Sequence, residues 1–378
     1  MNTVISNARI VTAAEEFRGS IHIADERISS VDRGATSIAA AEDWGNDWLL
    51  PGFIELHTDN LEKHLSPRPG VRWPALPAVL AHDAQLASGG ITTVLDALAL
   101  GDVKPDGTRT EHLMAMVAAI GAARAGGMLR AEHLLHLRCE LSTAGLVEMF
   151  EELAADPALT LVSLMDHTPG QRQFTDISKY REYYQGKYAL SDAAMDEFTA
   201  RQIDNQRRHS KSNRSAIVAY CRDKEVALAS HDDATPEHVA EAVADGVTIS
   251  EFPTTLAAAR LANRHGLGIL MGAPNVVRGG SHSGNISALE LASHNLLDGL
   301  SSDYVPTSLL HAAFLLKERT AWQLPQAIAS ISANPARMAG LTDRGEIAPG
   351  KRADYLRVRS NGSMPYIVSA WREGRRIL

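Results

Sequence analysis

Eight short apolar runs recur between residues 51 and 340, and helical patterns separate many of them. The runs cover residues 52–58, 90–100, 133–141, 159–167, 226–233, 247–253, 267–274 and 298–304. Alanine-rich patterns of helical period lie between runs, as at 75–89, 110–126, 235–246 and 255–266. Strands that alternate with helices form parallel βαβ units, and eight such units predict a closed, distorted (β/α)8 barrel of the TIM type. An open doubly wound sheet is the alternative, disfavoured because no helical pattern opens with G-x-G-x-x-G.

The two ends of the chain have a different texture. Short alternating runs separated by Gly, Asn and Pro turns predict strands there. We therefore expect residues 1–50 and 341–378 to form one small β-sandwich domain built from both termini, and residues 51–340 to form the barrel. A long, charged, mostly helical segment at about 169–215 interrupts the barrel pattern. This insertion is expected either to act as a lid over the strand ends or to pack on the barrel flank.

The composition indicates which kinds of partner the protein binds and in which cellular compartment it works. A formal net charge of -8 disfavours a nucleic-acid partner, although local basic clusters still permit a small anionic substrate. With Cys139 and Cys221 as the two cysteines, a disulfide framework is not expected. The start of the chain lacks the pattern of a signal peptide, and no apolar run is long enough to cross a bilayer. We expect a cytoplasmic protein without a membrane partner, and homo-oligomer formation stays open.

Six residues of metal-ligand type lie at the ends of the predicted strands, where a barrel of this kind carries its chemistry. They are His57, Asp59, Glu140, His167, His231 and Asp303. Each alone has a structural alternative, such as a hydrogen-bonded strand-end histidine or an ion-paired carboxylate, but the joint pattern favours a metal site. Imidazole and carboxylate together suit zinc first, with iron or manganese as alternatives, better than calcium. The sequence therefore predicts one or two divalent ions.

Several motifs resemble the amidohydrolase superfamily along the whole chain: LPGFIELHTDN, GGITTVLDAL, SSDY and NPARMAGLTDRGEIAPGKRADYLRV. The first motif of that superfamily is usually His-x-His, and here it is His57-Thr58-Asp59. By this resemblance Glu140 takes the place of a bridging carboxylated lysine. The segments HTDNLEKHLSPRPGVRWP and MGAPNVVRGGSHSGN are similar to the PhnM-type subgroup of the carbon–phosphorus lyase pathway. That similarity implies hydrolysis of α-D-ribose 1-methylphosphonate 5-triphosphate to the 5-phosphate and pyrophosphate.

Basic side chains near the predicted strand ends suit such an anionic substrate. Our expected substrate-binding residues come from the segment after the first strand, the start of the insertion, and the Gly-rich segment after the seventh strand. They are Lys63, His64, Arg68, Arg72, Arg172, Lys179, Arg278, Ser281 and His282. Glycines at 279, 280 and 284 would let backbone N–H groups approach an anion closely. The alternatives are a solvated loop after the first strand and an ordinary turn after the seventh.

The expected mechanism follows from divalent-ion chemistry, which lowers the pKa of water from ~15.7 to about 7 and polarises a phosphoryl oxygen. Asp303, at the last strand end, is the predicted catalytic residue that orients the water and takes its proton. No serine or cysteine lies in a recognisable nucleophile elbow, which disfavours covalent catalysis. A hydrolase of C–N bonds on the same barrel (a deaminase, cyclic amidase or deacetylase) is the alternative function. A non-catalytic scaffold is the third.

Some polar residues near these positions have less specific interpretations. Asp96, inside a predicted strand, is either a partner of a metal ligand or a satisfied buried carboxylate. Asp232 and Asp233 either hold the His231 ring or cap a turn. His133 and His136 fall on opposite faces of a regular strand, so they are not expected to chelate one ion together.

Overall fold

The computed structural model describes residues 2–101, 108–172, 177–188, 190–281, 284–362 and 364–378, with the side chains of 108–111, 179, 187 and 188 excepted. Its strands are β1 Thr3–Val11, β2 Glu16–Ala24, β3 Arg27–Arg33, β4 Glu42–Asp43, β5 Trp48–Pro51, β6 Phe53–Thr58, β7 Ile91–Leu100, β8 Glu132–Glu140, β9 Leu159–Met165, β10 Ala227–His231, β11 Ile249–Glu251, β12 Gly268–Gly272, β13 Gly299–Ser301, β14 Tyr355–Ser360, β15 Pro365–Arg372 and β16 Arg375–Arg376.

The helices alternate with these strands from β6 onward. They are α1 Asn60–Leu65, α2 Ala75–Ser88, α3 Thr108–Ala125, α4 Leu146–Ala154, α5 Ile177–Tyr188, α6 Asp192–Asn205, the π-helix η2 Gln206–Ser210, α7 Lys211–Asp223, α8 Pro236–Asp245, α9 Leu256–Arg264, α10 Ala273–Arg278, α11 Ala288–Ser293, α12 Ser308–Arg319, α13 Leu324–Ala329 and α14 Ala333–Met338. Among the described residues, no helix combines the length and apolarity that crossing a membrane requires.

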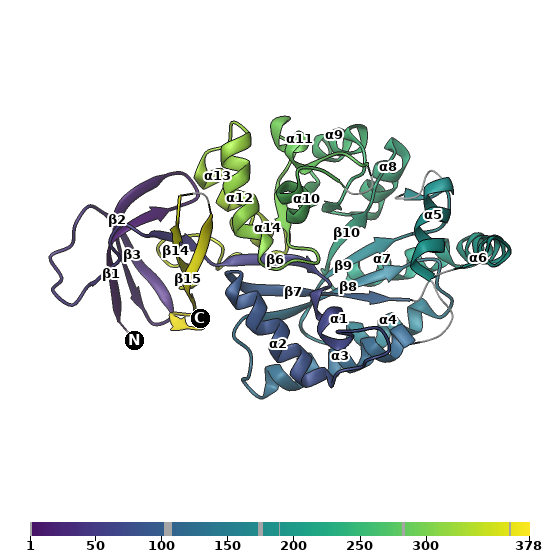
Figure 1. The fold of residues 1–378 in the computed structure, drawn as a ribbon, viewed down its shortest axis with the longest axis horizontal. Helices are drawn as coiled ribbons and strands as arrows, with labels where there is room; N and C mark the ends of the chain where they lie inside the picture. Colours follow the sequence, from purple (N-terminus) through teal and green to yellow (C-terminus); the bar gives the residue numbers. More distant parts are fainter. Residues whose placement is uncertain (1, 102–107, 173–176, 189, 282–283, 363) are drawn as a thin grey trace. The chain divides into compact units, whose positions relative to one another are not determined.

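Both chain termini contribute to one eight-stranded sheet, in the order β16-β15-β14-β5-β1-β2-β3, with β4 added beside β1. The purple N-terminal strands and the yellow C-terminal strands lie together in Figure 1. Ile21 and Ile28, near one edge of this order, share a buried core with Trp371 near the other edge. Trp371 stacks on Trp44 with ring centroids 5.5 Å apart. The sheet therefore curls around a single core, which confirms a terminal β domain built from both ends.

The second sheet has eight strands in the order β13-β12-β11-β10-β9-β8-β7-β6. The pairs β6–β7, β8–β9, β9–β10, β10–β11 and β11–β12 are parallel, as predicted for βαβ units. Every residue of β7 is buried, which explains why a continuous apolar run encodes it rather than an alternating one. The first and last strands meet through a parallel bridge between Thr58 and Asp303, so the sheet closes on itself. The predicted (β/α)8 barrel is thus confirmed.

Two compact units divide the chain differently from the predicted boundaries at 50/51 and 340/341, which stay predictions. Unit 1 comprises Met1–Asp96, Met116–Leu134 and Met271–Leu378, and unit 2 comprises Ala97–Ala115 and Leu135–Leu270. In unit 2, the predicted insertion at about 169–215 contains α5, α6 and η2 and the first residues of α7. Tyr180, Tyr184, Met195 and Phe198 form a small core of their own there. Whether this helical segment serves as a lid also stays a prediction.

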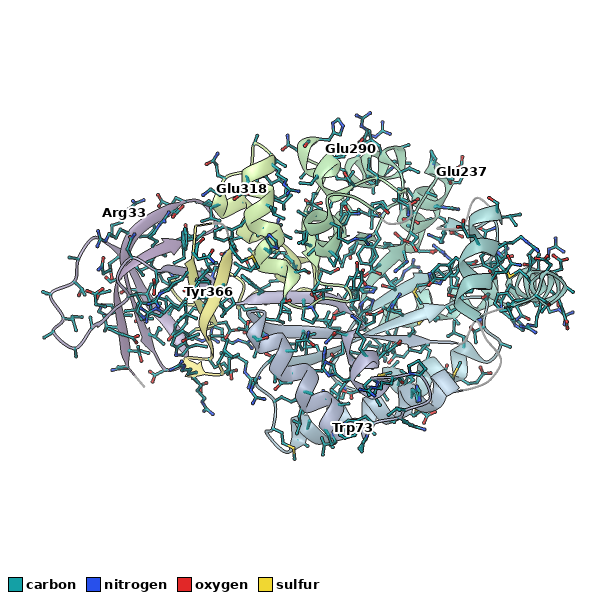
Figure 2. All side chains as sticks on the ribbon, viewed as in Figure 1. Arg33, Trp73, Glu237, Glu290, Glu318 and Tyr366 are labelled. Atoms are coloured by element: carbon teal, nitrogen blue, oxygen red, sulfur yellow. The ribbon has the colours of Figure 1, made fainter. Side chains whose placement is uncertain are left out.

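Local capping explains where several barrel helices begin. α8 starts after Thr235, whose side chain accepts a hydrogen bond from the His238 N–H, and α11 starts after Ser287 in the same way. Glu237 and Glu290 lie in the first turns of these two helices, where Figure 2 shows their side chains. A hydroxyl cap followed by an acidic first turn satisfies free N–H groups and complements the helix dipole.

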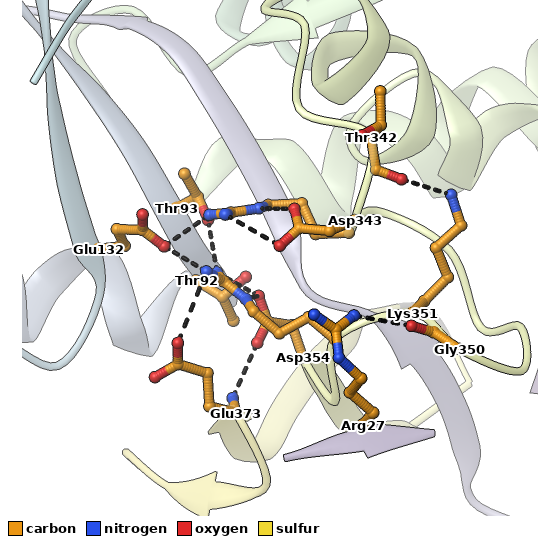
Figure 3. A network of polar contacts seen from close by, with 12 residues as sticks. Arg27, Thr92, Thr93, Glu132, Thr342, Asp343, Gly350, Lys351, Asp354 and Glu373 are labelled. Atoms are coloured by element: carbon orange, nitrogen blue, oxygen red, sulfur yellow. Dashed lines mark hydrogen bonds and ion pairs between the residues drawn. The ribbon is translucent and has the colours of Figure 1, made fainter. Parts of the chain in front are cut away.

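A polar network within unit 1 joins the end of the chain to the starts of β7 and β8 (Figure 3). Arg344 donates to Thr93 Oγ1 at 3.1 Å and to Glu132 Oε2 at 2.5 Å. Arg352 donates to the same Thr93 oxygen at 3.1 Å, pairs with Glu132, and donates from Nε to Asp354 Oδ2 at 2.8 Å. The guanidinium groups of Arg344 and Arg352 thus share the Glu132 carboxylate and the Thr93 hydroxyl, and Arg352 also pairs with the Asp354 carboxylate.

Candidate metal and active site

In unit 2, three of the predicted ligands lie at the ends of three neighbouring strands. Glu140 is the last residue of β8, His167 follows β9 by two positions, and His231 is the last residue of β10. The His167 backbone N–H donates to Glu140 Oε1 at 3.0 Å, and its Nδ1 lies 2.5 Å from Glu140 Oε2. The His167 and His231 rings have centroids 5.7 Å apart. The structure therefore brings Glu140, His167 and His231 together.

Asp232 joins this cluster beside the His231 ring. Its Oδ2 lies 2.9 Å from His231 Nδ1 and 3.8 Å from His167 Nε2. One ligand atom from each of His167, His231 and Asp232 lies within 4.8 Å of the other two. Asp232 adopts a φ of 58°, a left-handed conformation that non-glycine residues rarely take outside functional or turn positions. The chain therefore turns sharply after β10 where the carboxylate meets the two rings.

The electrostatics of this cluster keep its carboxylates ionised. Burial alone would raise the pKa of Glu140, but the neighbouring His167 holds that pKa below its usual value. Asp232 behaves in the same way, because His231 outweighs the burial effect and lowers the Asp232 pKa. Burial would lower the His231 pKa, yet Asp232 raises it. Anionic carboxylates beside imidazoles are the donor set that divalent transition ions prefer.

Sequence reasoning missed Glu251, the fully buried last residue of β11. Ser163 Oγ donates to Glu251 Oε2 at 2.8 Å and also lies 2.6 Å from His136 Nε2. His231 Nε2 is 3.7 Å from the same Glu251 oxygen. The position of Glu251 in the sequence could have identified it, because Glu251 is the last residue of a barrel strand, as Glu140 and His231 are.

In unit 1, the structure brings His57 and Asp303 together through the closure of the barrel. The Asp303 N–H donates to the His57 carbonyl at 3.1 Å, and Thr58 Oγ1 donates to the Asp303 carbonyl at 2.7 Å. Asp303 has a φ of 52°. Beneath them, buried Glu55 accepts hydrogen bonds from the N–H groups of His57 and Ser302 at 2.7 and 2.6 Å. Burial raises the pKa of Glu55 to about 8.

Asp59 supplies the test of whether unit 1 suits a cation. It precedes α1 without making a side-chain cap to that helix. Its Oδ1 is buried and has no hydrogen-bond partner among the described residues. A buried carboxylate oxygen in this state is costly unless a cation or donor meets it. This orphaned oxygen, like the imidazole–carboxylate cluster of unit 2, fits a divalent ion.

The segment after β6 places its basic residues in two different settings. The Lys63 ammonium donates to the Tyr304 carbonyl and lies 5.2 Å from the centre of the Tyr304 ring. His64 Nε2 lies 3.0 Å from Gln85 Oε1. Arg68 and Arg72 are exposed in the loop beyond α1, next to Trp73, which Figure 2 labels and which is 52% exposed.

The remaining predicted substrate-binding residues differ in their exposure and in whether other protein groups already bind them. Arg172 is buried, pairs with Asp233, and donates to Glu241 Oε2 at 3.1 Å, so protein carboxylates already engage its guanidinium. Arg278 is exposed in the last turn of α10, and Gly279, at φ 82°, ends that helix. Ser281 is half-buried. His282 and the Lys179 side chain lie outside the described residues, and all these binding roles stay predictions.

The comparisons with known proteins agree with this fold. Residues 48–371 match the amidohydrolase family. The chain belongs to the amidohydrolase family. It is also 49% identical, over 99% of its own length and 100% of the relative's, to the α-D-ribose 1-methylphosphonate 5-triphosphate diphosphatase of Escherichia coli K12. This family membership confirms the predicted resemblance and makes the chain a hydrolase.

Solved structures of much lower sequence identity share the fold. N-acetyl-D-glucosamine-6-phosphate deacetylase from Mycobacterium smegmatis is 17% identical, with a TM-score of 0.66 over 100% of both chains. A 5-methylcytosine deaminase from Klebsiella pneumoniae is 14% identical, with a TM-score of 0.67 over 100% of this chain and 97% of its own. At these identities the likeness extends to the fold alone.

Proposed function

We propose that this amidohydrolase cleaves α-D-ribose 1-methylphosphonate 5-triphosphate to the 5-phosphate and pyrophosphate. The observation that carries the proposal is the 49% identity, over essentially the whole of both chains, to a diphosphatase of that name. The reaction adds water across the anhydride between the first and second phosphates of the 5-triphosphate. One P–O bond forms to water, the bond to the departing pyrophosphate breaks, and the water's proton goes to a base.

Residues from both units are the proposed metal ligands: Glu140, His167 and His231 in unit 2, and His57, Asp59 and Asp303 in unit 1. Asp232 joins them as an additional candidate from its place beside His167 and His231. A bound divalent ion, with zinc as the first expectation, would acidify water and polarise the phosphoryl group. The imidazole–carboxylate donor set supports zinc over calcium.

Individual side chains would carry the remaining work. Asp303 would orient the attacking water and accept its proton, and the left-handed backbone at Asp303 supports a fixed orientation of its carboxylate. Lys63 and His64 on α1, and Arg68 and Arg72 beyond it, would stabilise the negative charge of the departing pyrophosphate. We place the reaction in the cytoplasm, supported by the two buried cysteines, which are both free.

The decisive experiment is a pyrophosphate-release assay on purified, metal-loaded protein. The ribose methylphosphonate triphosphate should release pyrophosphate, and prior removal of metal by a chelator should abolish the release. A parallel panel of N-acetyl amino sugars, cyclic amides and aminated bases tests the C–N alternative. Ammonia or deacetylated product without pyrophosphate would overturn the proposed substrate while leaving the barrel and the family unchanged.

A further inference from the structure

A second set of buried titratable side chains lies in unit 1, apart from the proposed ligands. His82 and Asp83 come from α2, Asp96 from β7 and His133 from β8, and all four are at most 2% exposed. His82 Nε2 lies 3.0 Å from Asp96 Oδ1, and His133 Nδ1 lies 2.7 Å from Asp96 Oδ2. Asp96 therefore sits between two imidazoles, one on each carboxylate oxygen.

The cluster is balanced without an ion, although three of its members have the spacing of metal ligands. His133 Nε2 also lies 3.4 Å from Asp83 Oδ1, and Arg130 donates to Asp83 Oδ2 at 3.1 Å. Burial opposes a charged imidazole, but the two carboxylates raise the His133 pKa to about 9. A protonated His133 and Arg130 then offset the two carboxylates. The contacts of Asp96 with both imidazoles and of Arg130 with Asp83 have the lengths of hydrogen bonds, whereas His133 Nε2 meets Asp83 as an ion-pair contact without a hydrogen bond.

A neutral His82 links this cluster to α1, because its ring lies between Asp96 and Asn60. Burial lowers the pKa of His82, which favours the neutral ring. A neutral ring that donates from Nε2 to Asp96 must accept at Nδ1, and the Asn60 amide lies 3.0 Å from that nitrogen. The same amide donates to Gln85 Oε1 at 2.9 Å. Asp96 therefore fixes the tautomer of His82, and His82 with Gln85 fixes the side chain of Asn60.

Asn60 is where α1 begins, directly after Asp59. A helix of six residues is far too short to be stable without tertiary anchors. The backbone N–H of Asn60 also donates to Thr58 Oγ1 at 3.3 Å, and the Thr58 hydroxyl donates to the Asp303 carbonyl. The orientation of α1 thus depends on the Asn60 anchor, and α1 carries Lys63 and His64.

We propose that Asp96, acting through His82 and Asn60, is a positioning residue that holds α1 and the adjoining Asp59 in place for metal and polyphosphate binding. This inference rests on the proposed function for its substrate and its metal, whereas the contacts that hold α1 are independent of that function. In this role Asp96 would act without touching substrate or ion.

The test compares Asp96→Asn with the wild type and with Glu132→Gln in the holoenzyme. Glu132 is the matched control, because it pairs with Arg344 and Arg352 in the same unit and is adjacent to His133 in sequence. Zinc affinity is measured by competition with a chromogenic chelator, and amide hydrogen exchange is followed in peptides covering residues 59–66. KM and kcat for pyrophosphate release are measured at saturating zinc.

Asp96→Asn should lower zinc affinity, by no more than the about 10- to 100-fold that follows the loss of a direct partner of a metal ligand, because Asp96 acts on Asp59 only through His82 and Asn60. It should also speed exchange in α1 and raise KM several-fold more than it lowers kcat. Glu132→Gln should lower the melting temperature without changing zinc affinity, α1 exchange or KM.

If Asp96→Asn does not fold, Asn60→Ala alone tests the proposal, since alanine keeps the helix propensity of α1 while removing the Asn60 side chain that anchors it. Unchanged zinc affinity and α1 exchange in the folded variants, or equal losses in Glu132→Gln, would overturn the proposal. Absence of pyrophosphate release from the wild type would overturn only the substrate.

Discussion

At the scale of single residues, the site depends on strand-end side chains held at unusual backbone angles. Asp232, Phe252 and Asp303 follow the last residues of β10, β11 and β13 closely and have φ values of 58°, 55° and 52°. For a non-glycine residue this conformation costs about 1–2 kcal/mol. Folding must offset that cost through contacts such as the hydrogen bond from Thr58 to the Asp303 carbonyl.

Replacing Asp303 with asparagine removes the proposed proton acceptor while keeping the side chain's size. We expect bound zinc, measured by atomic emission, to stay near the wild-type amount. Turnover should fall by roughly 10²- to 10⁴-fold, the range typical of losing a general base. Asp298→Asn, just before the opposite end of β13, is the matched control and should keep its activity. Wild-type turnover in Asp303→Asn would refute the assigned role.

His133 predicts a pH dependence of stability. Its pKa rises from 6.5 to about 9 in the folded protein because Asp96 and Asp83 outweigh burial. A raised pKa means that this contribution is fully present below pH 6.5 and is lost as the pH rises through about 9. The free energy of unfolding of the wild type, relative to His133→Gln, should therefore shrink by on the order of 2–4 kcal/mol between pH 6 and pH 10. Urea unfolding of both proteins across that range measures it, and a constant difference would contradict the assigned ion pairs.

At the scale of elements, α7 secures the loop that follows β8. Asn213 Nδ2 donates to the carbonyls of Leu141 and Thr143 at 2.9 and 2.8 Å, directly after Glu140. One helix earlier in the chain, Ser210 at the end of η2 donates to Asp166 Oδ2 at 3.0 Å, next to His167. π-helical turns often occur at functional sites, and this one aligns a hydroxyl with a strand-end carboxylate.

We expect Asn213→Ala to lower the free energy of unfolding by about 1–3 kcal/mol, because it removes the amide donor from one buried and one part-buried carbonyl. Amide exchange in residues 141–146 should accelerate. Ser215→Ala on the exposed side of α7, where the hydroxyl donates to the Lys211 carbonyl in the same helix, is the control. Equal exchange rates in the two variants would show that Asn213 does not hold this loop.

The sequence predicted the elements better than the contacts between them. Eight apolar runs placed the eight barrel strands because strands buried on both faces need continuous apolar residues. Strand ends then identified Glu140, His167 and His231, which the structure brings together. Glu251 was missed although it ends a strand run, as Glu140 and His231 do. The link from Asp96 through His82 to Asn60 was missed because it joins residues far apart in the chain, which no local period encodes.

At the scale of the whole molecule, the network around Arg352 joins distant parts of the chain within unit 1. Arg352 is buried and pairs with Asp354, Glu132 and Glu373. Burial opposes its charge, but Asp354 and Glu132 raise the Arg352 pKa further above its usual value. The guanidinium therefore stays charged at any pH at which the protein is folded.

Arg352→Met should destabilise the protein by about 3–5 kcal/mol, since it leaves buried Asp354 without its charged partner. The double variant Arg352→Met, Asp354→Leu removes both charges and should recover much of that loss. Chemical unfolding of the two variants and the wild type measures these differences. A single variant as stable as the wild type would contradict the role of the network.

The pairing of β5 with both β1 and β14 also sets an order of events during synthesis on the ribosome. β1, β2, β3 and β5 are translated before β14, residues 355–360, yet β5 pairs with β14 on the side away from β1. Until then the nascent chain carries an open strand edge beside a largely assembled apolar core. A ribosome that stalls before residue 355 would therefore release a chain prone to edge-to-edge association, a natural target for chaperones that bind exposed strands.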